Sequence, residues 1–161
     1  MEIRSIFGGI TSWNQLEPGV LFYVPIKEGT RLGMKVEQSR EYRNSPLYSC
    51  LLFDSVSRLE SSNRCQQATL VELKDAAFIS TKIAAFSDPP LVGQIIQVRE
   101  HGPLLNVLDQ NGNPVAVQLG TGKVLGKWPT QPEALFSTPE WKIVLPAPLA
   151  TDRWHTIWPL D

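Results

Sequence analysis

The feature that most constrains this fold is a series of short apolar segments, separated by turn sequences, between residues 93 and 128. The apolar segments cover residues 95–98, 104–108 and 115–119, and a shorter one surrounds Val124. Apolar and polar residues alternate in the third segment, which is the period of a half-buried strand. The pattern predicts an antiparallel β-meander that either closes into a small barrel or packs open against a helix.

The turn between the second and third segments contains Asn111-Gly112. A type I′ turn needs positive φ at both central residues, and Asn followed by Gly meets that need at low cost. We therefore expect a tight type I′ hairpin at this position.

The same stretch resembles ligand-binding loops only superficially. Residues 109–113 begin like a calcium loop, but the later Gly and Glu positions of an EF-hand do not match. Gly120, Gly122 and Gly126 are spaced wrongly for a dinucleotide loop, and a strand follows them where that motif has a helix. These residues predict turns and close packing.

The clearest helical pattern starts after residue 44. Ser45 is a good N-cap, and Pro46 suits the first position of a helix. Apolar residues then recur at helical spacing, at Tyr48, Leu52, Val56 and Leu59. With strands expected at 20–26 and around 32–36, the sequence predicts a β-rich α+β fold with one main helix over residues 46–60.

Residues 66–86 fit two structures. Thr69 and Glu72 match a capping box, which favours a helix. The apolar residues, however, surround a helical wheel without leaving a polar side, and many have β propensity. We favour two strands joined near residues 74–75. The strongest break follows at 87–90 (SDPP), so we expect one domain, 1–161, with a subdomain break near 87–90.

Composition limits the classes of function. Fifteen basic and sixteen acidic residues give a net charge of −1, so the chain lacks the basic surplus typical of nucleic-acid binding. We see neither a signal-like N-terminus nor an apolar run long enough to span a membrane. Cys50 and Cys65 are the two cysteines, and we expect them to stay reduced in a cytoplasmic protein.

Catalytic and metal-binding patterns are weak. His101 and His155 are candidate general bases, but their spacing to cysteines and carboxylates matches no known arrangement. The histidines and cysteines also lack the close pairs of a zinc site. We expect no metal and no cofactor, and we favour a protein without catalytic activity. A small enzyme with a spatially assembled site stays as an alternative.

A basic segment between residues 27 and 43 supports another alternative. In a small β-barrel, basic loops and nearby tyrosines can bind single-stranded nucleic acid, although acidic residues are interleaved here. The nucleic-acid-binding candidates are Lys27, Arg31, Lys35, Arg40 and Arg43.

The tryptophans of the C-terminal region support the leading hypothesis. Trp141, Trp154 and Trp158 are candidate partner-binding residues, because tryptophan is enriched at the centres of protein interfaces. The chain end either packs back on its own core or docks on another subunit. We expect a non-catalytic binding or adaptor protein that contacts another protein or a second copy of itself, as a subunit of a larger assembly.

Overall fold

The computed structural model describes residues 9–26, 29–38, 47–53, 58–73, 75–85, 91–125, 134–146 and 154–158. These residues are mainly β-strand. The helical elements among them are short: a 3-10 turn, η1 (Trp13–Gln15), and a single-turn helix, α1 (Asn63–Gln66). None of the helices in the described ranges is long and apolar enough to cross a membrane.

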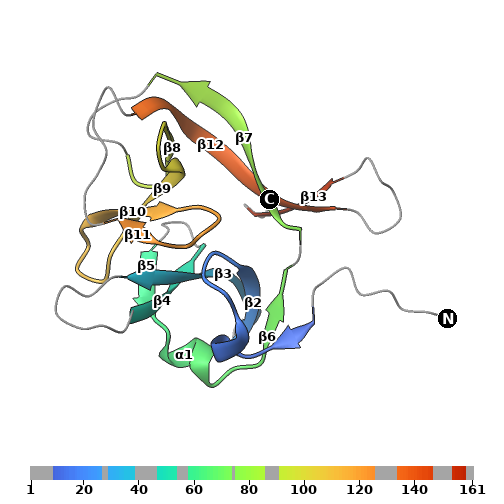
Figure 1. The fold of residues 1–161 in the computed structure, drawn as a ribbon. Coiled ribbons are helices and arrows are strands. Elements are labelled where there is room, and N and C mark those ends of the chain that lie inside the picture. Colours follow the sequence, from blue (N-terminus) through green and yellow to red (C-terminus); the bar gives the residue numbers. More distant parts are fainter. Residues whose placement is uncertain are drawn as a thin grey trace.

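Strands from the first part of the chain form one half of the molecule (Figure 1). They hydrogen-bond in the order β1-β6-β2-β3-β4-β5, and every neighbouring pair is antiparallel. The strands are β1 (Ile10–Thr11), β2 (Leu21–Ile26), β3 (Gly29–Gln38), β4 (Leu47–Leu52), β5 (Arg58–Ser61) and β6 (Leu70–Glu72).

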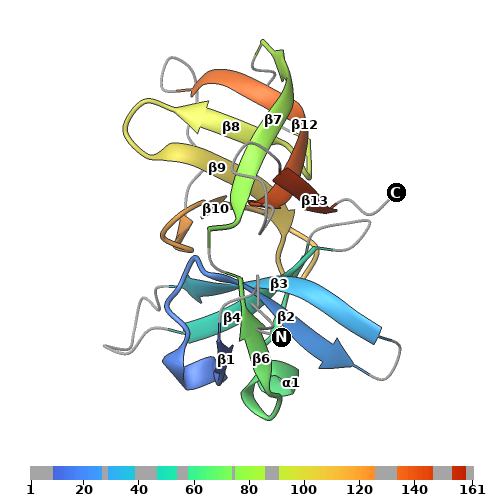
Figure 2. The ribbon, with the colours of Figure 1, turned by 90° about the vertical axis from the view of Figure 1, so that its right-hand side faces the viewer.

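The remaining strands form the other half, which lies above the first half in Figures 1 and 2. The long strand β12 pairs with β7, β8 and β13. The strands are β7 (Ala77–Ala84), β8 (Ile95–Val98), β9 (Gly102–Leu108), β10 (Pro114–Gln118), β11 (Val124–Leu125), β12 (Ala134–Pro146) and β13 (Trp154–Trp158).

The two halves belong to one mixed sheet. They join where β5 runs parallel to β9, with Arg58 opposite Leu108. The sheet stays open, so the barrel alternative is wrong. The meander itself is confirmed, because β8, β9, β10 and β11 pair in sequence order and antiparallel.

The hairpin between β9 and β10 is confirmed, but its predicted turn type is wrong. Gly112 has a φ of 83°, whereas Asn111 is not among the described residues with positive φ. Asp109 organises the loop instead: its Oδ1 accepts hydrogen bonds of 2.8 Å from the backbone N–H groups of Asn111 and Asn113. The Asp109 side chain thus bonds to the backbone of the loop that follows it, and Gly112 takes the left-handed conformation. The result is a longer turn than type I′.

The main helix predicted over residues 46–60 is wrong, and so is the α+β class that depended on it. Within the described part of that range the chain forms β4 and β5. The reason lies in the burial of β4, where Leu51 faces one core while Cys50 and Leu52 face another. A strand buried on both faces carries a nearly continuous apolar run, and such a run also fits a helical stripe.

The choice of strands for residues 66–86 is confirmed. β6 and β7 occupy this segment, and Asp75 between them has a φ of 61°. The strand pairing changes here from the first half to the second, since β6 pairs with β1 and β2 whereas β7 pairs with β12. The expected subdomain break near 87–90 lies outside the described residues.

The largest apolar core lies between the two halves. It joins residues of β2, β3 and β4 to residues of β8, β9, β10 and β12, including Met34, Leu51, Leu105 and Ile143, which are all fully buried. A second core, under η1 and α1, covers the other face of the first half and contains Trp13 and Phe22. Tyr23 and Phe22 face opposite sides of β2.

Candidate functional site

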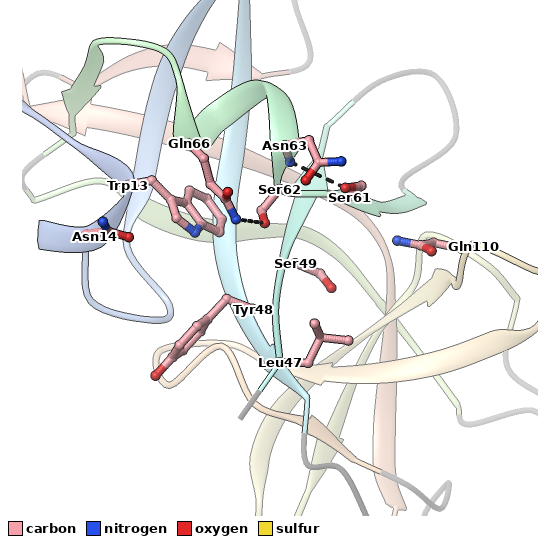
Figure 3. A pocket seen from close by; sticks show the side chains of 10 residues that line it. All are labelled: Trp13, Asn14, Leu47, Tyr48, Ser49, Ser61, Ser62, Asn63, Gln66 and Gln110. Atoms are coloured by element: carbon pink, nitrogen blue, oxygen red, sulfur yellow. Dashed lines mark hydrogen bonds between the residues drawn. The ribbon is translucent and has the colours of Figure 1, made fainter. Parts of the chain in front are cut away.

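A pocket of about 470 Å³ opens between η1, β4 and α1 (Figure 3). Figure 3 shows side chains from three sides: the η1 turn, the start of β4, and the passage from β5 into α1. The loop after β9 adds one residue on a fourth side. The lining residues are Trp13, Asn14, Leu47, Tyr48, Ser49, Ser61, Ser62, Asn63, Gln66 and Gln110.

The wall formed by α1 follows from a local sequence, Ser61-Ser62-Asn63. The Ser61 Oγ accepts a hydrogen bond of 3.3 Å from the backbone N–H of Asn63, which turns the chain out of the strand direction. Gln66 then donates from Nε2 to the Ser62 Oγ at 2.8 Å. These contacts, drawn in Figure 3, hold α1 in a fixed position at the end of β5.

The turn into α1 leaves part of β4 without a strand beside it. β4 pairs with β3 along its whole length, from Leu47 to Leu52. On its other edge β5 pairs only from Ser49 to Leu52, because the chain leaves the strand path after Ser61. In the described part of the chain, no strand therefore pairs with Leu47 and Tyr48 on the side that faces the pocket.

Lys35 of β3 holds the aromatic wall of the pocket. Its Nζ donates hydrogen bonds of 2.8 Å to the backbone carbonyls of Trp13 and Leu16, and the side chain is only 4% exposed. The same ammonium lies 5.0 Å from the centroid of the Trp13 ring and 4.5 Å from that of Tyr48. Lys35 thus ties the η1 turn to β3 and fixes two rings by cation–π contacts.

Burial lowers the pKa of Lys35, and the negative charge of Glu17 partly opposes this effect. The carbonyls and rings around the ammonium stabilise the charged form less completely than water does. Burying the charged ammonium of Lys35 therefore costs free energy. The contacts that it makes with the η1 carbonyls and the two rings are structural.

The described residues that line the pocket are polar but uncharged. Serine hydroxyls and the amides of asparagine and glutamine offer both donors and acceptors, while Trp13, Leu47 and Tyr48 supply apolar area. Among the described residues, the lining contains no Asp, Glu, His, Cys, Lys or Arg side chain. Such a surface is suited to recognising a neutral polar ligand by hydrogen bonds and ring contacts.

A second cavity, of about 340 Å³, lies in the other half of the molecule. Its lining is more apolar and includes core residues such as Ile95 and Leu119. Its described lining has one aromatic ring, Phe78, and one amide, Gln97, whereas that of the first pocket has two rings and four amides. We therefore take the pocket beside β4 as the candidate site.

The nucleic-acid candidates are not brought together in the described residues. Lys35 is buried with its Nζ bonded to two carbonyls, so it is not placed to neutralise a phosphate. Arg31 is half-buried on β3. Lys27, Arg40 and Arg43 lie outside the described residues.

The tryptophan candidates lie in the second half of the molecule. Trp141 is 6% exposed, packs against Phe53 and Phe78, and donates from Nε1 to the Gly93 carbonyl at 2.6 Å. In this conformation it is a core residue and not a surface anchor. β13 begins at Trp154 and ends at Trp158, and it pairs with β12 of the same chain. The side chains of the two tryptophans lie outside the described set.

His101 lies in a different half of the molecule from the two cysteines. His101 is exposed between β8 and β9, and its carbonyl accepts a hydrogen bond from Gln118 Nε2. The side chain of His155 is outside the described set. Cys50 and Cys65 are both buried, behind the pocket. Within the described ranges, no three His, Cys, Asp or Glu residues gather as metal ligands do.

Sequence reasoning missed the pocket residues. Ser61, Ser62 and Asn63 were a visible signal, because a run of small polar residues marks a place where the chain turns. That run does not reveal which segments face it. Trp13, Tyr48 and Gln110 reach the pocket only through strand pairings between distant parts of the sequence.

Comparison of this chain with known protein families, with curated proteins and with solved structures finds no match.

Proposed function

We propose that this chain is a non-catalytic binding protein that takes up a short, extended segment of a partner protein in the pocket beside β4. The observation that carries the proposal is the position of the pocket. It lies along the stretch of β4, Leu47 and Tyr48, that has no strand beside it among the described residues. An extended peptide there would continue the line of β5 and pair with β4.

The chemistry of the lining supports the same partner. In peptide recognition by strand addition, backbone hydrogen bonds give affinity and side-chain pockets give specificity. Uncharged donors and acceptors, such as Asn63 and Gln66, suit small polar side chains of a peptide. A neutral sugar would suit these groups as well, but it has no ladder of N–H and C=O groups to match the strand edge.

The Tyr48 ring is the proposed anchor of the complex. It is 36% exposed, so one part of the ring is free for contact, while Lys35 fixes its position from within. A ring that is already held loses little conformational entropy when it binds. Partly exposed tyrosines are frequent contributors to interface energy.

Selection from a random peptide library displayed on phage tests this function. Peptides recovered on the purified protein should be uncharged at their central positions, and isothermal titration calorimetry should give one peptide per chain. Amide signals of Leu47, Tyr48 and Ser49 should shift on binding in NMR spectra. Recovery of no peptide, or shifts confined to the other half of the molecule, would refute the proposal.

Matched variants test whether the peptide binds in the pocket. Tyr48→Ala should weaken binding by about tenfold or more, which corresponds to about 1.4 kcal/mol, while Tyr48→Phe should bind nearly as well as the native chain. Asn63→Arg should also weaken binding by filling the pocket. Thr81→Arg, on an exposed position of β7 in the other half, is the control and should have no effect.

The location of this activity is part of the proposal. We place it in the cytoplasm, as the sequence analysis predicts. Microscopy of the fluorescently tagged full-length chain in its native cell tests this placement, and a signal confined to another compartment would contradict it.

A further inference from the structure

Two cysteines meet directly behind the pocket. Cys50 lies on β4 and Cys65 on α1, and they are 1% and 3% exposed in the same apolar core. Each thiol is the main cause of the other's pKa shift, so the two side chains are close neighbours in this core, although the residues stand fifteen positions apart in the sequence. Both thiols are free. Contact between two such side chains is the main geometric requirement for a disulfide.

The cysteines belong to the two facing walls of the pocket. Cys50 follows Ser49, which lines the pocket from β4. Cys65 lies between Asn63 and Gln66, which line it from α1. A covalent bond between the two sulfurs would therefore fix the distance between the walls.

We propose that Cys50 and Cys65 form a reversible disulfide that locks α1 against β4 and holds the pocket in its open, binding conformation. The effect on partner binding rests on the proposed function. Formation of the disulfide and its effect on α1 are independent of the proposed function.

α1 depends on the cysteine contact more than a longer helix would. It is a single turn, held by the backbone hydrogen bond from Gln66 N–H to the Ser62 carbonyl at 2.9 Å and by the Gln66 side chain. Short elements with few hydrogen bonds open locally at low cost. Opening of α1 gives a small oxidant access to Cys65, and the disulfide then removes this motion.

Hydrogen peroxide is a sufficient oxidant. The Cys65 sulfur attacks one peroxide oxygen, the O–O bond breaks, and the leaving hydroxide takes the thiol proton to form water. The Cys50 sulfur then attacks the sulfur of the resulting sulfenic acid. The S–O bond breaks, the S–S bond forms, and the second hydroxide leaves as water with the Cys50 proton. Two thiols are oxidised, and one peroxide is reduced to two waters.

The environment of the pair assigns the roles of the two sulfurs. The hydrogen bond between them raises the pKa of Cys50, and burial adds to this effect. The same hydrogen bond lowers the pKa of Cys65, which is the better attacking sulfur because the thiolate is the nucleophile. Glu60 opposes thiolate formation at both residues.

Mass spectrometry of the full chain tests the bond itself. Native protein treated with stoichiometric hydrogen peroxide should lose two hydrogens, resist alkylation at both cysteines, and give a linked peptide pair after digestion. A reducing phosphine should restore both thiols. A disulfide that forms only in denaturant, or sulfenic acid without a disulfide, would overturn the inference.

Hydrogen exchange and thermal unfolding, measured without any partner, test the effect on the wall. Oxidised protein should exchange the amides of residues 63–66 more slowly than reduced protein, and its Tm should rise by about 5–10 °C. Peroxide-treated Cys65→Ser protein should show neither change, and reduced native protein serves as the reference if this variant does not fold. A disulfide that leaves exchange in α1 unchanged would refute the lock, whatever the pocket binds.

Discussion

The Lys35 ammonium lies 4.5 Å from the centroid of the Tyr48 ring, on the side of that ring that faces into the protein. It also bonds to two carbonyls of the η1 region, so one buried cation connects β3, β4 and the turn that carries Trp13. The aromatic part of the candidate site is therefore built before any ligand arrives.

Lys35→Met should lower the free energy of unfolding by about 1–3 kcal/mol. The carbonyls of Trp13 and Leu16 would lose their ammonium donor, while relief from burying a charge offsets part of the loss. Urea denaturation measures the change. Lys123→Met, at an exposed position, is the control and should shift stability by less than about 0.5 kcal/mol. Equal, small changes in both variants would show that the contacts of Lys35 with the η1 region do not stabilise the fold.

The pH dependence of stability should show the buried charge. Because burial lowers the pKa of Lys35 below its ordinary 10.5, the unfolded chain holds this proton more tightly than the folded chain. The stability of the native protein should therefore rise relative to Lys35→Met as pH increases through the window between the folded pKa and 10.5. Burial also raises the pKa of Tyr23, but Tyr23 is common to both proteins, so its contribution cancels. A stability difference that is flat with pH, or falls, would contradict this account of Lys35.

Gly122 should tolerate no side chain. Its φ is +68°, and a Cβ there would lie 2.6 Å from the Lys35 carbonyl, at the contact between the β10–β11 turn and β3. Gly122→Ala should therefore destabilise the fold by about 3 kcal/mol or more. Gly120→Ala is a matched control, because its φ is +93° but its Cβ would enter open space. It should cost about 1 kcal/mol, and an equal cost in both variants would show that close packing at Gly122 is unimportant.

Trp141→Phe should lower the unfolding free energy by about 2 kcal/mol. The change removes the N–H donor to the Gly93 carbonyl and leaves a void beside Phe53 and Phe78. Binding of a selected peptide should be unchanged, because Trp141 does not line the pocket. Unchanged stability together with weakened binding would restore Trp141 as a partner contact.

Local sequence patterns predicted the parts of the fold where turn residues or a clear alternation of side chains mark the strands. The meander was predictable because turn residues separate β8, β9, β10 and β11. The two faces of β2 were also predictable, since Tyr23 and Phe22 alternate in an obvious strand. β4 was not, because both of its faces are buried and its apolar residues imitate a helix. The pairing of strands far apart in the sequence decided that segment.

The candidate site was not predictable from local patterns. Trp13, Tyr48, Asn63 and Gln110 come from four separate segments, and each has an ordinary local environment in the sequence. They meet because β3 pairs with β4 and because β5 runs beside β9. The basic segment 27–43 suggested a surface site, yet Lys35 at its centre is buried, because its long side chain reaches two carbonyls of the η1 region.

A backbone methylation scan of a selected peptide tests the central claim most directly. An N-methyl group removes one backbone donor and keeps the side chain, so it separates strand pairing from side-chain contact. If the peptide adds to β4 at Leu47 and Tyr48, alternate N-methyl groups should weaken binding by about tenfold or more, and those between them should have little effect. Affinity that is insensitive to N-methylation at every position would contradict strand addition as the function of this pocket.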